Sequence, residues 1–236
     1  MIPGVLKVLF HLSFVRPFVV FYLGLRKRSV IEWDKALPSR GPAIIIANHN
    51  SNADTPIIES LFPLHFVGKV RPVAAKDYWA KTKLLDWFAR NVMRVIYVER
   101  GSGQSGKDPY GEVHAALARG EIIILYPEGK RGKPEEPTEI KKGITYLMQQ
   151  HPLVPVIPIH LYGAGKAFGT ADRWWKHIPV PFIVDVLVGE NLSPRDPQVP
   201  ADPDSIQAAV ARIIYHQAVC NRFAELKSAN CRGAWV

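Results

Sequence analysis

A histidine and an aspartate five residues apart form the pair in this chain best suited to acid–base chemistry. His49 follows the apolar run 43–46, and Asp54 precedes Thr55-Pro56, the expected N-cap and first position of a helix. On one continuous helix this spacing would place the two side chains about 140° apart. Across a strand end, a turn and a helix start, the chain can fold back. The carboxylate then accepts a hydrogen bond from one imidazole nitrogen, and the other nitrogen can act as a base.

The sequence offers no nucleophile of its own to accompany this pair. It contains no Gly-x-Ser-x-Gly motif, and its two cysteines, Cys220 and Cys231, lie near the C-terminus. A His/Asp pair without a nucleophile suits an enzyme whose substrate supplies one, such as a hydroxyl group that is to be acylated. The alternative is that His49 and Asp54 are turn and capping residues, because Asp is common at helix starts.

Short buried runs alternate with amphipathic stretches along the chain, which predicts an α/β fold. Its expected core is a central, mostly parallel mixed sheet flanked by helices. The prolines of the run 155–159 favour an edge or bulge position for that strand. The expected strands lie at 43–46, within 65–76, and at 94–100, 122–126, 155–159 and 182–188; the expected helices lie after Thr55 and at 78–90, 111–119, 139–150 and 205–227.

Polar residues directly follow three of the expected strands. His49, Arg100 and Glu128 each lie just beyond a strand end. Ligands of open α/β sheets gather at the carboxyl ends of the strands, so parallel strands would bring these three residues to one crevice. Lys141, near the start of helix 139–150, either contacts a phosphate there or belongs to a solvated basic face. The apolar side of helix 78–90 could pack in the core or face a membrane, and we expect it to pack in the core.

The first 30 residues are expected to form a separate element. Residues 5–25 are the most apolar part of the chain, but charged residues and Pro17 interrupt them before the about 20 residues of a membrane span are reached. No cleavage site follows, and Arg26-Lys27-Arg28 close the run, which argues against a signal peptide. Residues 1–30 are expected to form short helices lying in one membrane leaflet, because aromatic and basic residues together suit an interface. The alternative is a helix pair packed on the α/β domain, residues 31–236.

The charge balance predicts an anionic partner. The net charge of +9 suits a nucleic acid, a phosphorylated substrate or an anionic lipid surface. The segment 101–108 nearly matches a phosphate-binding Gly-x4-Gly-Lys-Ser/Thr loop, but Asp108 replaces the hydroxyl that would bind magnesium. We therefore expect a flexible loop there. Two cysteines make no disulfide framework, which favours the reducing cytosolic side.

Four motifs in this order resemble the PlsC-type glycerolipid acyltransferases, typified by 1-acyl-glycerol-3-phosphate acyltransferase. The resemblance covers about residues 30 to 190, and the apolar N-terminal segment also resembles the two-helix membrane-binding element of that family. The motifs are Asn48-His49-x4-Asp54, Tyr97-Val98-Glu99-Arg100, Tyr126-Pro127-Glu128-Gly129-Lys130-Arg131 and Val154-Pro155-Val156-Ile157-Pro158-Ile159.

The resemblance implies roles for individual residues. His49 would be the general base that removes the proton of the acceptor hydroxyl, and Asp54 would orient it. The family transfers a fatty acyl group from a thioester of coenzyme A or acyl carrier protein directly to the lysolipid hydroxyl, so no metal, cofactor or covalent acyl-enzyme is expected. The candidate substrate-binding residues are Arg100 for the acceptor's phosphate, Glu128 and Gly129 for the glycerol, and the basic residues Lys130, Arg131 and Lys141.

Four positions depart from the family pattern. Arg94 stands where a glycine usually opens the second motif, and Tyr126 replaces the usual phenylalanine. Lys130 and Gly132 replace the usual threonine and serine. Arg94, Tyr126 and Lys130 are expected at or beside the acceptor site, so these departures bear on the acceptor's head group rather than on the acyl transfer.

The leading hypothesis is an O-acyltransferase that converts lysophosphatidic acid into phosphatidic acid at the cytoplasmic face of a membrane containing anionic lipids. A second hypothesis changes the acceptor to another lysolipid or to glycerol 3-phosphate. From different classes come a basic nucleotide- or nucleic-acid-binding protein built on the 101–108 loop, and a membrane-surface binder without turnover. The four motifs favour acyl transfer and no nucleic-acid partner.

Overall fold

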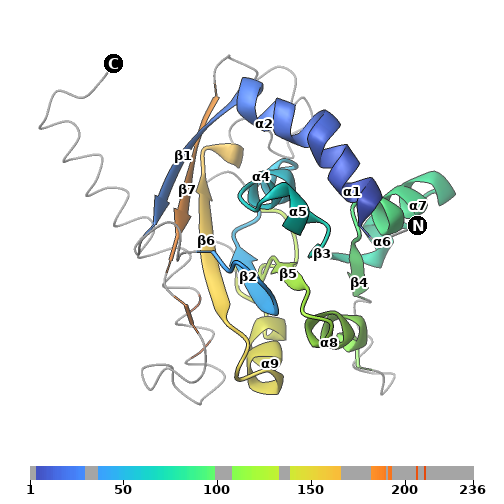
Figure 1. Ribbon diagram of the computed structural model, residues 1–236. Coiled ribbons are helices and arrows are strands. Elements are labelled where there is room, and N and C mark those ends of the chain that lie inside the picture. The colour runs from blue at the N-terminus through green and yellow to red at the C-terminus, as the bar shows by residue number, and fades with distance from the viewer. Residues whose placement is uncertain are drawn as a thin grey trace, which may run out of the picture.

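A seven-stranded sheet organises the molecule, with the strand order β1-β7-β6-β2-β5-β3-β4 (Figure 1). The computed structural model describes residues 4–29, 37–98, 108–132, 139–165, 182–189, 191–192, 206 and 210. Among the described strands, β6 and β7 pair antiparallel and every other neighbouring pair is parallel, which confirms the predicted mostly parallel mixed sheet. The strands are β1 (Leu23–Ser29), β2 (Ala43–Ala47), β3 (Val70–Ala75), β4 (Ile96–Val98), β5 (Ile122–Leu125), β6 (Val156–Tyr162) and β7 (Phe182–Val188).

Helices cover both faces of this sheet. The N-terminal helices lie with α4 and α5 on one face, and α8 and α9 lie on the other (Figure 1). Strand β2 contributes to the apolar cores on both faces of the sheet. Ile45 belongs to the core shared with α4 and α5, and Ile44 and Ile46 belong to the core shared with α8 and α9. This double burial explains its uninterrupted apolar sequence. The helices are α1 (Val5–Phe10), the π-helix η1 (His11–Val15), α2 (Arg16–Tyr22), α4 (Asp54–Ser60), α5 (Leu64–Val67), α6 (Lys76–Trp79), α7 (Lys83–Asn91), α8 (Gly111–Ala118) and α9 (Gly143–Gln150).

The N-terminal helices form one continuous helical segment from Val5 to Tyr22 that Pro17 does not split. The wide π-helical turn before Pro17 lets the helix continue, since the proline has no N–H to donate to that turn. One side of this segment is buried against the domain, and the opposite side is exposed. The buried residues are Lys7, His11, Val15 and Val19; the exposed ones are Val5, Leu9, Leu12, Phe14 and Val20. No helix among the described residues is long and apolar enough to cross a membrane.

Residues 23–29 differ from the expectation that residues 1–30 form a separate helical element. They form β1, which pairs in parallel with β7 and closes one end of the described sheet. The prediction failed because the partner strand lies more than 150 residues further along the chain.

Strand β6 lies inside the sheet, between β2 and β7, so its predicted edge position is wrong. Pro158 is accommodated there because it lies at the end of the β6–β7 ladder. Pairing with β7 begins at Ile159, opposite Val188, and the Pro158 carbonyl accepts the last hydrogen bond from Gly189 N–H at 2.9 Å. Pro158 has no N–H with which to return a hydrogen bond to Gly189, so the missing bond falls at the end of the ladder and interrupts no pairing inside it.

The expected helix 78–90 is divided into α6 and α7, and its apolar residues do not all pack in the core. Leu84 is 77% exposed and Trp87 is 51% exposed, so the prediction of a core-facing apolar side is wrong for these two. Arg100, the loop 101–107 and all but two residues of the expected helix 205–227 lie outside the described residues.

Candidate active site

His49 and Asp54 lie together where β2 ends. The Nδ1 atom of His49 donates a hydrogen bond to Oδ2 of Asp54 at 2.8 Å, which confirms the predicted fold-back of the chain. The carboxylate is fully buried, whereas the imidazole is 21% exposed. Because Nδ1 carries the proton that Asp54 accepts, Nε2 is the basic nitrogen of the ring.

Asp54 also organises the turn that carries the histidine. The same Oδ2 atom accepts the backbone N–H groups of Asn50 and Ser51, each at 2.8 Å. Helix α4 begins at Asp54, with Ala53 as the residue before it, so the predicted N-cap at Thr55 is wrong. These three hydrogen bonds to one oxygen therefore fix the orientation of the Asp54 carboxylate.

The loop after β5 holds the backbone of His49 from both sides. The N–H of His49 donates to Oε1 of Glu128 at 3.0 Å, and its carbonyl accepts from Gly132 N–H at 2.8 Å. Glu128 is fully buried. Between Glu128 and Gly132 the chain turns at Gly129, whose φ of 68° is a conformation that favours glycine. The parallel pairing of β2 with β5 thus brings the expected strand-end residues His49 and Glu128 together, as predicted.

Three residues that support this arrangement were not predicted to do so. The buried side chain of Asn48 exchanges hydrogen bonds with the backbone of Leu161 at 2.7 and 2.9 Å, which ties the end of β2 to β6. The ring of Tyr126 stacks on the imidazole of His49, and its hydroxyl bonds to Thr55 at 2.7 Å. Burial, followed by the nearby charge of Asp54, raises the pKa of Tyr126 well above its usual value. The signals in the sequence were that Asn48 opens the first motif and that Tyr126 replaces a phenylalanine.

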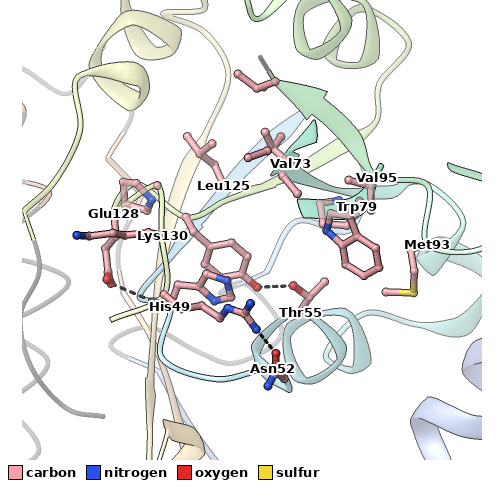
Figure 2. Close-up of a pocket in the computed structure, with 18 of the residues that line it drawn as sticks. His49, Asn52, Thr55, Val73, Trp79, Met93, Val95, Leu125, Glu128 and Lys130 are labelled. Carbon is pink, nitrogen blue, oxygen red and sulfur yellow. Dashed lines mark hydrogen bonds between the residues drawn. The ribbon is translucent and has the colours of Figure 1, made fainter. Parts of the chain in front are cut away.

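A cavity of about 1290 Å³ opens beside His49. It exceeds the about 300–1,000 Å³ of ordinary small-molecule sites. One end is polar and the rest is apolar, bounded by Phe10, Phe14 and Phe18 of the N-terminal helices. Figure 2 shows the two ends: the polar residues His49, Asn52, Thr55, Glu128 and Lys130, and the apolar residues Val73, Trp79, Met93, Val95 and Leu125.

Basic residues line the polar end of this cavity. Lys130 and Lys141 are exposed there, and Arg131 donates to the side-chain oxygen of Asn52. Lys141 also pairs with Glu139 at 2.6 Å. The structure therefore brings every described candidate substrate-binding residue to one cavity. Within the described part of the chain, no group of three or more His, Cys, Asp or Glu side chains is placed to hold a metal ion.

The family model described as Acyltransferase matches residues 28–162, which is more than half of the chain. The chain belongs to the acyltransferase family. Two curated proteins are similar to this chain. They are a protein named Taffazin from Dictyostelium discoideum and the chloroplastic 1-acyl-sn-glycerol-3-phosphate acyltransferase BAT2 from Brassica napus. The first is 26% identical, over 69% of this chain and 59% of that protein. The second is 27% identical, over 58% of this chain and 38% of that protein.

This acyltransferase therefore matches less than two thirds of the length of either relative. The crystal structure of the 1-acyl-sn-glycerophosphate (LPA) acyltransferase PlsC from Thermotoga maritima aligns with a TM-score of 0.61 at 20% identity. The alignment covers 88% of this chain and 76% of that one. At this identity the likeness shows a shared fold. The predicted membership of the PlsC-type acyltransferases is confirmed.

The departure from the family pattern at Arg94 has a structural explanation, and this residue lies away from the cavity. Arg94 has a φ of 56°, in the left-handed region where glycine is favoured, which accounts for the glycine expected there. Its guanidinium donates to the Gly68 carbonyl and, at 2.7 Å, to Glu121. Glu121 precedes β5, whereas Glu128 follows it, so Arg94 lies at the opposite end of that strand from the site. Its expected position beside the acceptor site is wrong.

Proposed function

We propose that this acyltransferase moves a fatty acyl group from a thioester of coenzyme A or acyl carrier protein to the free hydroxyl of a lysophospholipid. Lysophosphatidic acid, giving phosphatidic acid, is the acceptor we favour. The observation that carries the proposal is the His49–Asp54 pair at the polar end of an apolar cavity with basic residues beside it. The family assignment supports acyl transfer, and the name of the BAT2 relative supports a glycerophosphate acceptor.

His49 acts as the general base in this proposal. As the acceptor hydroxyl attacks the thioester carbonyl carbon, its proton passes to Nε2, and Asp54 stabilises the imidazolium that forms. Collapse of the tetrahedral intermediate breaks the carbon–sulfur bond, and the leaving thiolate takes the proton from His49. A positioned base contributes about 10²- to 10⁴-fold to such a rate. Holding hydroxyl and thioester together in a water-poor cavity supplies more.

The two ends of the cavity suit the two ends of a lysolipid. The apolar walls formed by residues such as Phe14 and Trp79 would hold acyl chain, and Lys130, Arg131 and Lys141 would attract a phosphate. Arg100 is proposed as a further phosphate ligand, and Glu128 and Gly129 as the wall of the glycerol site.

We also propose that the N-terminal helices lie in the surface of a membrane with anionic lipids, at its cytoplasmic face. Their exposed side carries large apolar residues, and three of their phenylalanines line the cavity. A lysolipid could therefore pass from the bilayer to His49 without crossing water. An amphipathic helix of this kind binds at the depth of the headgroups.

The decisive assay combines the purified protein with a panel of lysolipids and with acyl-coenzyme A or acyl carrier protein, and identifies the product by mass. We expect lysophosphatidic acid to gain one acyl group. His49→Ala should lower the rate by about 10²- to 10⁴-fold. His65→Ala is the matched control, because His65 is exposed and does not line the cavity. Full activity of the His49 variant would exclude the proposed mechanism.

A further inference from the structure

An exposed apolar pair on α7 has no role in the site described above. Leu84 and Trp87 are 77% and 51% exposed and do not line the cavity. Their spacing of three residues places them on the same side of the helix. Single exposed apolar residues are common on proteins, so the surroundings of this pair decide whether it has a function.

The exposure is a property of a well-formed helix rather than of a frayed end. The Thr82 side chain caps α7 by accepting the Leu85 N–H at 3.2 Å. Asp86 and Arg90 form an ion pair at 3.0 Å along the helix. Ala89 is fully buried and belongs to a small core with neighbouring apolar residues. The helix thus has one packed side and presents Leu84 and Trp87 to solvent.

Helix α7 lies beside the N-terminal helices, although the two are far apart in the sequence (Figure 1). The ring of Phe10 packs edge-on against Phe88 of α7 at 5.4 Å and lies 5.5 Å from the ring of Phe14. Phe14 is itself 65% exposed. All three rings line the cavity. The N-terminal helices and α7, which both carry exposed apolar residues, therefore each contribute a part of the wall of this cavity.

Basic residues are frequent in α6, in α7 and in the segment between them. Residues 76–91 contain four basic and two acidic side chains, and the four basic ones, Lys76, Lys81, Lys83 and Arg90, are all exposed. Tryptophan and leucine among lysines are the composition that favours a bilayer interface with anionic headgroups. The net charge of +9 acts in the same direction.

We propose that α7 is a second membrane-binding element, in which Leu84 and Trp87 insert into the headgroup region of an anionic bilayer. With α7 and the N-terminal helices in the same membrane surface, both sides of the cavity contact lipid, and a lysolipid can enter between them. This inference deepens the proposed function, but it concerns binding to the bilayer and can be measured without catalysis.

The test measures binding of the full chain to vesicles of phosphatidylcholine with and without phosphatidylglycerol. Leu84→Asn combined with Trp87→Asn should weaken binding to the anionic vesicles by about tenfold, from the loss of two partly inserted apolar side chains. Leu153→Asn is the matched control, since Leu153 is 63% exposed and lies outside α7. Trp87→Phe should keep the binding but lose part of the tryptophan quenching by brominated lipids.

Wild-type affinity in the double variant, or equal binding to neutral and anionic vesicles, would overturn the proposal. So would a dimeric wild type that becomes monomeric in the double variant with unchanged vesicle binding, because the surface would then be a contact between copies. With a short-chain soluble lysolipid and thioester, the double variant should keep the wild-type rate. A wild type that binds vesicles but acylates no lysolipid would contradict the proposed function and leave the membrane surface intact.

Discussion

The imidazole of His49 stacks on the ring of Tyr126, with centroids 4.0 Å apart and planes inclined by 17°. Asp54 holds the same imidazole by its edge through Nδ1. An edge contact alone leaves the ring able to rotate about that hydrogen bond, whereas a face contact restrains its plane. The tyrosine is in turn tied to α4 through Thr55. We infer that Tyr126 is a positioning residue for His49.

Tyr126→Phe keeps the ring and removes its link to Thr55. We expect kcat to fall by less than about fivefold and the free energy of unfolding to fall by about 1 kcal/mol. Tyr126→Leu removes the stacking and should lower kcat by up to about a further tenfold. If the hydroxyl acts only through Thr55, then Thr55→Val combined with Tyr126→Phe will be no worse than either alone. Additive losses in this double-mutant cycle would reject the link.

Asp54→Asn should be among the most damaging conservative changes. An amide that turned its N–H₂ toward these three donors would favour the wrong tautomer of His49, and one that kept its oxygen there would lack the negative charge that stabilises the imidazolium. Loss of this orientation costs about 10⁴-fold in kcat in a serine-protease triad. Steady-state acylation rates measure the effect. Asp77→Asn, at an exposed position of α6, is the control. Unchanged kcat in the Asp54 variant would show that the pair is only a turn motif.

Lys7 anchors the N-terminal helices through a buried cluster. It donates to Glu59 and to the carbonyls of Val70 and Met93 at 2.7 and 2.9 Å, while His11 bonds to the other Glu59 oxygen at 2.8 Å. Burial lowers the pKa of Lys7, and Glu59 opposes that shift. Lys7→Met should reduce the free energy of unfolding in urea by about 3–5 kcal/mol, because it leaves a buried carboxylate without its cation.

The exposed Lys83 provides the control for that measurement, as Lys83→Met should change stability by less than about 0.5 kcal/mol. Adding Glu59→Gln to Lys7→Met should recover part of the loss, since the uncompensated charge is then removed. A Lys7 variant as stable as the wild type would mean that the cluster does not hold the helices to the domain.

The contact between α8 and α9 should weaken in acid. His151 Nε2 lies 2.6 Å from Nδ1 of His114, whose Nε2 lies 2.9 Å from Asp108. Burial, and then the neighbouring His114, lower the pKa of His151. Below about pH 6.5 the unfolded chain therefore binds more protons than the folded protein does. The contribution of His151 to the free energy of unfolding is complete above that pH and is lost as the pH falls. Urea unfolding at pH 7.5 and 5.5 should show a smaller loss in His151→Gln than in the wild type. An identical loss would exclude His151 as the cause.

Local patterns predicted the parts of the molecule that depend on neighbouring residues. The apolar runs gave β2, β5 and β7 nearly to the residue, and the polar turn after β2 predicted the His49–Asp54 hydrogen bond. The parallel alternation of strands and helices predicted that His49 and Glu128 meet at one end of the sheet. These inferences succeeded because hydrophobic periodicity, strand length and turn chemistry are written into short stretches of chain.

The sequence by itself thus determined the α/β class, the order of most elements and the acid–base pair. The tertiary structure decided what long-range contacts control: that residues 23–29 pair with β7, that β6 is an interior strand, that Tyr126 stacks on His49, and that Leu84 and Trp87 face outward. In each case the deciding partner lies dozens of residues away or is solvent itself. A run of apolar residues specifies that a surface must be covered, and only the assembled fold determines what covers it.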